Sequence, residues 1–285
     1  MKKLVLSLVS IMFLLGLTAC GQTADPVNSN GKSNKKDGLT LQEVFEKSTD
    51  ASKKLKSVHS DMELKQTMNV PDQQAPMNIN STLSIDMVLN PIAMHQQMKM
   101  TMEGGDESVQ GQSMDIEAYM AKEGFFLQDP TSKQWVKMPE ELSKQALQMP
   151  EDQVNPAEQL KQLKQFTDDF SFKQDEKQYI LTLKASGEKF DKFLKETAKQ
   201  LMPEQLKANE EVFNNLTFNS MDYEIFIDKK TFNITALNMT QDLDMLIENQ
   251  KVNMKQEMKG TYTNYNKITE IKVPKEVIET AQELN

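Results

Sequence analysis

The chain has 285 residues, of which 38% are hydrophobic, and a formal net charge of −9. It contains no arginine, and an acidic chain without arginine lacks the basic groups that usually contact phosphates and bases, so we expect no nucleic-acid partner. The single cysteine, Cys20, excludes an internal disulfide framework and any zinc site built from cysteines.

The first nineteen residues have the pattern of a secretory signal peptide. Lys2 and Lys3 precede an apolar run that is too short for a confident membrane span. Residues 17–20, Leu-Thr-Ala-Cys, resemble the lipobox of bacterial lipoproteins. That resemblance implies that Cys20 becomes the new N-terminus after cleavage and that its sulfur receives a diacylglyceryl group in thioether linkage, which carries acyl chains such as palmitate. The alternative is an ordinary secretory signal that happens to contain a cysteine.

Acyl chains contribute about 0.8 kcal/mol per buried methylene, so a multiply acylated Cys20 would hold the protein stably on a membrane. We therefore expect a lipid-anchored protein on the extracytoplasmic face of the cell membrane. The residues that follow Cys20, up to residue 38, are polar and contain no aromatic side chain. This composition predicts a flexible tether between the lipid and a folded domain.

Residues 39–56 are predicted to form a helix. Thr40 is the expected N-cap, and Glu43, three residues later, completes a capping box. Small and apolar side chains recur at helical spacing and predict one buried stripe, made of Leu41, Val44, Phe45, Ser48, Ser52 and Leu55.

Four long β-strands are predicted next, over residues 58–70, 77–89, 92–102 and 109–121. In the second of them Ile79, Leu83 and Ile85 share one face, while Asn80 and Ser84 share the other. Alternation with period two over this length is typical of half-buried antiparallel strands. One face of this predicted sheet is rich in methionine.

The remainder of the chain continues the alternation of strands and helices. Strands are predicted at 125–128, 134–137, 170–174, 178–185, 220–227, 232–247 and 251–264. Helices are predicted at 139–148, 156–167, 188–202, 204–214 and 274–284. Because no linker-like segment interrupts residues 39–285, we expect a single α+β domain there.

This order of elements resembles an uncharacterised family of Gram-positive lipoproteins with a LolA/LppX-like half-barrel. Two segments carry the resemblance: residues 119–137, with a glycine, aromatic residues, an Asp-Pro turn and Trp135, and residues 228–239, with an aspartate, a turn and a long strand. The resemblance implies a curved antiparallel β-sheet, a half-barrel, with helices covering the concave face. Carriers of this fold hold acyl chains between the sheet and the helices.

The inward-facing methionines are the candidate ligand-binding residues. Methionine is unbranched and polarizable and suits surfaces that accept varied apolar ligands. The strongest candidates are Met62, Met87, Met94, Met98, Met100, Met114, Met120, Met245 and Met254. These side chains could instead fill the space between sheet and helices, and the sequence leaves both interpretations open.

We expect no catalytic residue, metal or cofactor. The chain lacks the Gly-x-Ser-x-Gly, His-Glu-x-x-His and P-loop motifs. A Cu(I) site formed by Met98, Met100 and Met102 with His95 is disfavoured, because His95 is predicted on the opposite face of its strand. His59 and His95 are expected to be solvated, and Trp135 is expected to pack over the sheet edge rather than contact a ligand.

The sequence thus predicts a membrane-anchored, non-enzymatic binder or carrier of a hydrophobic molecule such as a lipid. The alternative is a structural or protein-interaction lipoprotein of the cell envelope with a filled core and no ligand. The sequence does not indicate which ligand or protein partner is involved.

Overall fold

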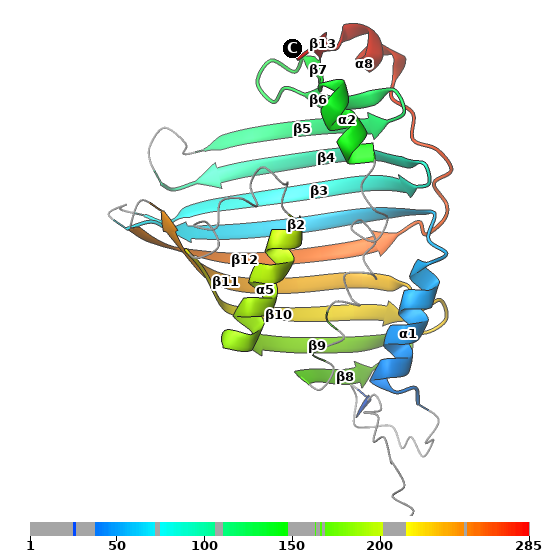
Figure 1. Cartoon of the computed structure of the whole chain (residues 1–285), viewed down its shortest axis with the longest axis vertical. Helices are drawn as coiled ribbons and strands as arrows, with labels where there is room; N and C mark the ends of the chain where they lie inside the picture. The colour runs from blue at the N-terminus through cyan, green and yellow to red at the C-terminus, as the bar shows by residue number, and fades with distance from the viewer. Residues whose placement is uncertain are drawn as a thin grey trace, which may run out of the picture.

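The computed structural model describes residues 25–26, 38–71, 75–105, 111–147, 163, 166, 169–201, 215–247 and 250–284. Its strands form one 13-stranded sheet in the order β1-β8-β9-β10-β11-β12-β2-β3-β4-β5-β6-β7-β13. The long axis of the molecule runs across the strands, from β8 at one end to β7 and β13 at the other (Figure 1).

The strands are β1 (Asp25–Pro26), β2 (Ser57–Asn69), β3 (Met77–Leu89), β4 (Ile92–Glu103), β5 (Gln112–Ala121), β6 (Gly124–Gln128), β7 (Trp135–Lys137), β8 (Phe170–Gln174), β9 (Gln178–Ser186), β10 (Leu216–Asp228), β11 (Ile234–Ile247), β12 (Gln250–Thr263) and β13 (Gln282–Glu283). The described helices are α1 (Leu41–Ser52), α2 (Glu140–Leu147), α5 (Glu188–Leu201) and α8 (Lys275–Thr280). The predicted strands after residue 57 are confirmed with small shifts at their ends. The predicted helices over 156–167 and 204–214 lie outside the described residues, apart from Leu163 and Phe166.

Long antiparallel strands that follow one another in the chain make two meanders, and one non-local pairing joins them. β2 to β7 form the first meander, and β8 to β12 form the second. β12 then pairs antiparallel with β2, from Asn253 opposite Asn69 to Thr263 opposite His59. The two halves of the chain therefore share one continuous sheet.

Helix α1 begins and packs as its sequence predicts. The Thr40 side chain accepts a hydrogen bond from the Glu43 backbone N–H, and the Glu43 carboxylate accepts one from the Thr40 backbone N–H (2.8 Å). Phe45, which is 2% exposed, meets Phe170 of β8 edge-to-face with ring centroids 5.6 Å apart. This helix therefore closes the buried core at the β8 end of the sheet.

The predicted fold class, an α+β half-barrel with helices covering the concave face, is wrong. The chain is mostly β, the sheet is open, and the described helices have only 6 to 14 residues. α5 contacts β9 and β10, and α2 contacts β5 and β6. A helix is about 10 Å wide and strands are about 4.8 Å apart, so each helix covers roughly two strands of a much wider sheet. None of the described helices has the length and apolarity needed to span a membrane.

The last part of the chain, residues 264–283, is here called the C-terminal segment. It leaves β12, passes the ends of β2 to β5, forms α8 and ends as β13, which pairs in parallel with β7 (Figure 1). Its Val273 and Val277 pack with Val88 and Phe126 of the sheet in a second buried cluster. This segment therefore connects the middle of the sheet to its far edge.

Candidate functional site

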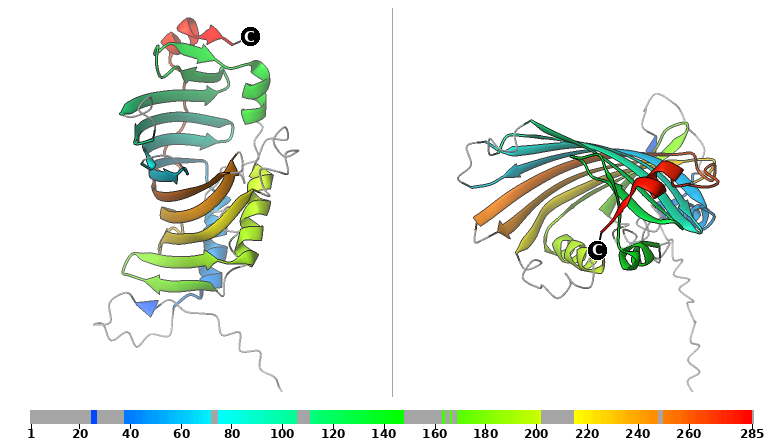
Figure 2. Two further views of the ribbon diagram at one scale, coloured as in Figure 1. Left: turned by 90° about the vertical axis from the view of Figure 1, so that its left-hand side faces the viewer. Right: turned by 90° about the horizontal axis from the view of Figure 1, so that it is seen from above.

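The two faces of the sheet differ in what they carry. We call the face that packs against α1 and α5 the inner face, and the opposite face, which packs against the C-terminal segment, the outer face (Figure 2). Residues directly opposite each other in an antiparallel sheet lie on the same face, so the strand register assigns every side chain to one of them.

All nine predicted methionines lie on the inner face. Met87 is opposite Met94, and Met94 is opposite Met120, so three strands bring three methionines into one row. Met100 is opposite Met114 in a second row. Between these rows, Leu83 lies between Met62 and Met98.

Most of these methionines are only partly buried. Met120 is 3% exposed, whereas the other eight keep an intermediate exposure. Met62 and Met87 reach the edge of the core that α1 closes. The seven methionines of β2 to β5 therefore form an apolar, partly accessible surface, which we call the methionine patch: Met62, Met87, Met94, Met98, Met100, Met114 and Met120.

Met245 and Met254 belong to the same face but not to the same place. Met254 is opposite Met68 of β2, whereas Met87 is opposite Val58 of the same strand. Ten residues of β2 separate those positions, which is about 33 Å at 3.3 Å per residue. The Met100–Met114 row is level with Leu64, only four residues or about 13 Å along β2 from Met68, so Met245 and Met254 continue the same methionine-bearing face towards the other end of the strands.

His59 lies on the outer face between two carboxylates. Its Nδ1 is 2.7 Å from Asp86 on the next strand, and its Nε2 is 3.0 Å from Asp61 on its own strand. Partial burial alone would lower the pKa of His59, but the hydrogen bonds to Asp86 and Asp61 raise that pKa above its usual value. The two carboxylates therefore favour the protonated form of His59, which is held by hydrogen bonds rather than freely solvated as its strand position predicts.

His95 makes a second polar group beside the first. Its Nε2 is 2.8 Å from the Glu117 carboxylate, and its ring stacks on Tyr119 with centroids 4.3 Å apart. Burial, with the Glu117 charge, raises the pKa of Tyr119 to about 12. Trp135 lies 5.7 Å from Tyr119, at the edge of the outer-face cluster with Val273 and Val277. It packs there as predicted.

The register rules out the copper arrangement that the sequence raised. His95 is opposite Tyr119 on the outer face, whereas Met98 and Met100 lie on the inner face of the same strand. Among the residues that the structure describes, no group of three or more His, Asp or Glu side chains could hold a metal ion.

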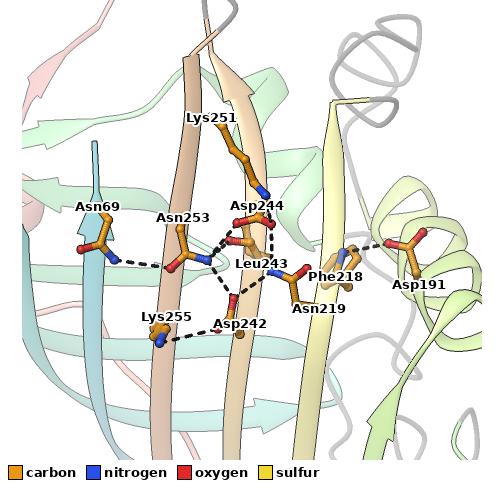
Figure 3. A network of polar contacts seen from close by, with 10 residues as sticks. All are labelled: Asn69, Asp191, Phe218, Asn219, Asp242, Leu243, Asp244, Lys251, Asn253 and Lys255. Carbon is orange, nitrogen blue, oxygen red and sulfur yellow. Dashed lines mark hydrogen bonds and ion pairs between the residues drawn. The ribbon is translucent and has the colours of Figure 1, made fainter. Parts of the chain in front are cut away.

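A polar network lies on the outer face near the starts of β10 and β12 and the end of β11, far along the strands from His59 (Figure 3). The Asn219 amide donates to Asp242 and Asp244, both at 3.0 Å, and the Asn253 amide donates to the same two carboxylates at 2.8 and 2.9 Å. Hydrogen bonds from Asn219, Asn253 and Lys251 hold the pKa of Asp244 at about 2. Two neighbouring carboxylates are thus stabilised by amides from the strands on either side.

Sequence reasoning places Asp242 and Asp244 on the polar face of their strand but misses the two asparagines. Asn219 and Asn253 belong to different strands, and no spacing in the chain relates them to the aspartates. The network surrounds a shallow hollow of about 580 Å³. Each carboxylate already accepts hydrogen bonds from asparagines of the neighbouring strands. These bonds link β10, β11 and β12, so the network stabilises the sheet.

The two hairpin segments on which the family resemblance was based specify turns. Asp129 Oδ1 accepts hydrogen bonds from the backbone N–H groups two and three residues later, at 3.0 and 2.6 Å. Asp228 Oδ1 accepts the corresponding bonds at 3.0 and 2.8 Å. Each turn ends in a residue with positive φ, Lys133 at 60° and Phe232 at 58°. These aspartates therefore shape the backbone, and the methionine patch stays the candidate binding surface.

Comparison with known proteins gives one family and several distant structures. A model described as a family of unknown function (DUF6612) matches residues 40–282, and no curated protein matches the chain. A structure titled "Lipid-protein interactions in lipovitellin" matches with a TM-score of 0.35 and 7% identity, covering 77% of this chain and 26% of that one. The chain thus spans about a quarter of the lipovitellin chain.

Two further structures cover most of both chains. A DUF1329 family protein from Desulfovibrio piger matches with a TM-score of 0.23 and 8% identity, covering 79% of this chain and 93% of that one. A β-barrel-like DUF1849 protein from Brucella abortus matches with a TM-score of 0.19 and 7% identity, covering 73% and 96%.

Proposed function

This chain belongs to the family of unknown function DUF6612, and from its N-terminal sequence around Cys20 we propose that it is a membrane-anchored extracytoplasmic lipoprotein. In this proposal the protein binds or carries a hydrophobic molecule, such as a lipid, and catalyses no reaction.

The methionine patch is the observation that carries the binding proposal. Its seven thioether side chains lie on four adjacent strands, and six of them remain partly exposed. Burying apolar surface contributes about 25 cal/mol per Å², so a ligand that covers several of these side chains gains affinity from area alone. Methionine adapts its shape to the ligand, which favours a broad class of apolar molecules over one compound.

Cys20 and the residues before it support the anchor. Replacing Cys20 with alanine removes the only thiol that could carry acyl chains. The Cys20→Ala chain should move from the membrane fraction to the soluble fraction or the culture medium. A variant that stays in the membrane fraction would overturn the anchor.

Ligand binding is tested on residues 22–285, which retain every described element. Native mass spectrometry after incubation with membrane lipids should show a stoichiometric apolar adduct. The matched variants are Met100→Glu and Thr101→Glu, which add the same charge to neighbouring residues on opposite faces of β4. Only Met100→Glu should remove the adduct. A clean protein mass for the unmodified chain would favour the alternative, an interaction lipoprotein without a ligand.

A further inference from the structure

The polar segment after Cys20 contains a contact with the folded domain. Asp25 and Pro26 form β1, which pairs in parallel with Lys173 and Gln174 of β8. The sequence predicts a flexible tether throughout this region, and the structure places part of it on the sheet. β8 is the last long strand at its end of the sheet, so β1 lies along that edge.

The chain also returns to the same place. Gly38, three residues before α1, lies beside Gln174: a Cβ added at Gly38 would be 3.9 Å from the side-chain nitrogen of Gln174. Gln174 is the residue that pairs with Pro26. Both ends of the stretch between Pro26 and Gly38 are therefore at one edge strand, and α1 starts from there.

From these contacts we infer that the β8 edge of the sheet faces the lipid bilayer, an inference that rests on the proposed acylation of Cys20. Asp25 follows Cys20 by five residues, which span at most about 17 Å even when fully extended. The anchored end of the chain therefore lies within about 17 Å of β1, whatever path the residues between take, and β1 is one strand spacing of about 4.8 Å from β8.

The sheet then extends away from the membrane. Ten strand spacings of about 4.8 Å separate β8 from β7, so the far edge lies about 48 Å beyond the β8 edge. The methionine patch spans β2 to β5, which corresponds to about 24–38 Å from β8. The patch is thus presented to the aqueous side, above the bilayer surface and not within it.

The β8 edge and the turn after it carry exposed charges of both signs. Lys173 of β8 and Lys177 of the turn after it are exposed there, and such lysines are attracted to anionic headgroups. Asp175, in the turn after β8, accepts two hydrogen bonds from backbone N–H groups of its own turn. Asp169, Asp175 and Glu176 are exposed carboxylates at the same edge, so the inferred orientation rests on the β1 contact and not on charge.

The orientation is measured on the full acylated protein in vesicles of phosphatidylcholine and phosphatidylglycerol. Because Cys20 is acylated, Lys173→Cys and Gln282→Cys each introduce a single free thiol, on β8 and on β13. Energy transfer from a dye on each thiol to a headgroup-labelled lipid reports height above the bilayer. We expect transfer at position 173 to exceed that at position 282 by about threefold or more, given the ~50 Å between the edges. Equal transfer would overturn the orientation.

Two insertions test the role of β1. Ten Gly and Ser residues after Gln22 lie between the lipid and β1, whereas the same insertion after Asn30 lies between β1 and α1. A flexible insert of this length adds about 17 Å of mean reach. Only the first insertion should reduce transfer at position 173, because β1 keeps the second one out of the path to the membrane. Equal effects of both insertions would overturn the β1 contact.

Flotation of the same vesicles separates this inference from the proposed function. Protein that fails to float with the vesicles refutes the Cys20 anchor and the orientation together. Protein that floats but shows equal transfer from both edges refutes the orientation alone.

Discussion

Asn266 holds the start of the C-terminal segment against the chain just before β2, and its replacement gives the sharpest test of the fold. Its Oδ1 accepts hydrogen bonds from the backbone N–H groups of Lys56 (2.6 Å) and Ser57 (3.4 Å), and its Nδ2 donates to the Lys54 carbonyl (3.3 Å). Its own backbone N–H donates to the Ser57 carbonyl at 2.8 Å. Asn266 also has a φ of 59°, which few residues other than glycine and asparagine adopt.

Asn266→Ala and Asn266→Gly separate these two roles. Both variants lose the side-chain hydrogen bonds, of which one is short and two are long, at a cost of about 1–2 kcal/mol in the free energy of unfolding. Alanine adds about 1–2 kcal/mol of strain at positive φ. Glycine avoids the strain, but its greater conformational entropy in the unfolded chain lowers the free energy of unfolding by about 0.4–1 kcal/mol. We therefore expect the glycine variant to be more stable than the alanine variant by about 0.5–1 kcal/mol.

Urea unfolding followed by the fluorescence of Trp135 is the assay. Trp135 is the only tryptophan, and it packs at the cluster that the C-terminal segment completes, so its emission reports the docking of that segment. Both variants should have lower midpoints than the unmodified protein. If alanine and glycine are equally destabilising, the strain argument is wrong. If neither lowers the midpoint, the Asn266 hydrogen bonds do not hold the segment.

Three further substitutions test local interactions. Thr40→Ala removes the N-cap of α1 and should destabilise the protein by about 1 kcal/mol in urea, whereas Thr40→Ser should be nearly neutral. His59→Gln should be destabilising at pH 5 and progressively less so towards pH 8. The raised pKa of His59 means that its contribution is complete below about 6.5 and is lost as pH rises through the folded-state pKa. A cost that does not change with pH would refute this. Asn253→Ala should raise the pKa of Asp244 from about 2 towards 3.8 in an NMR titration. It should also reduce the stability that this carboxylate contributes above its unfolded pKa and loses on acidification.

Local features of the fold follow from the sequence with little error. The bounds of β3, Met77–Leu89, agree with the prediction, and the capping box of Thr40 and Glu43 is confirmed. Both depend on interactions between residues at most a few positions apart. Strand alternation and helix capping are properties of short segments, so they can be recognised before any tertiary contact is known.

The arrangement of these elements depends on contacts between distant residues. The pairing of His59 with Thr263 joins the two meanders, and no pattern within either strand specifies it. The carboxylates around His59, the amides around Asp244 and the contact of Pro26 with β8 likewise come from separate strands. The prediction that helices cover the concave face was wrong for the same reason, since the width of the sheet depends on how many strands join.

The sequence by itself determined that these segments form strands and which side chains of each strand share a face. Alternation of side chains is a property of an extended backbone and needs no partner strand. Only the tertiary structure decided which of the predicted methionines are neighbours, because strand order and register determine which side chains meet. The same long-range pairing determines which edge of the sheet lies beside the residues that follow Cys20.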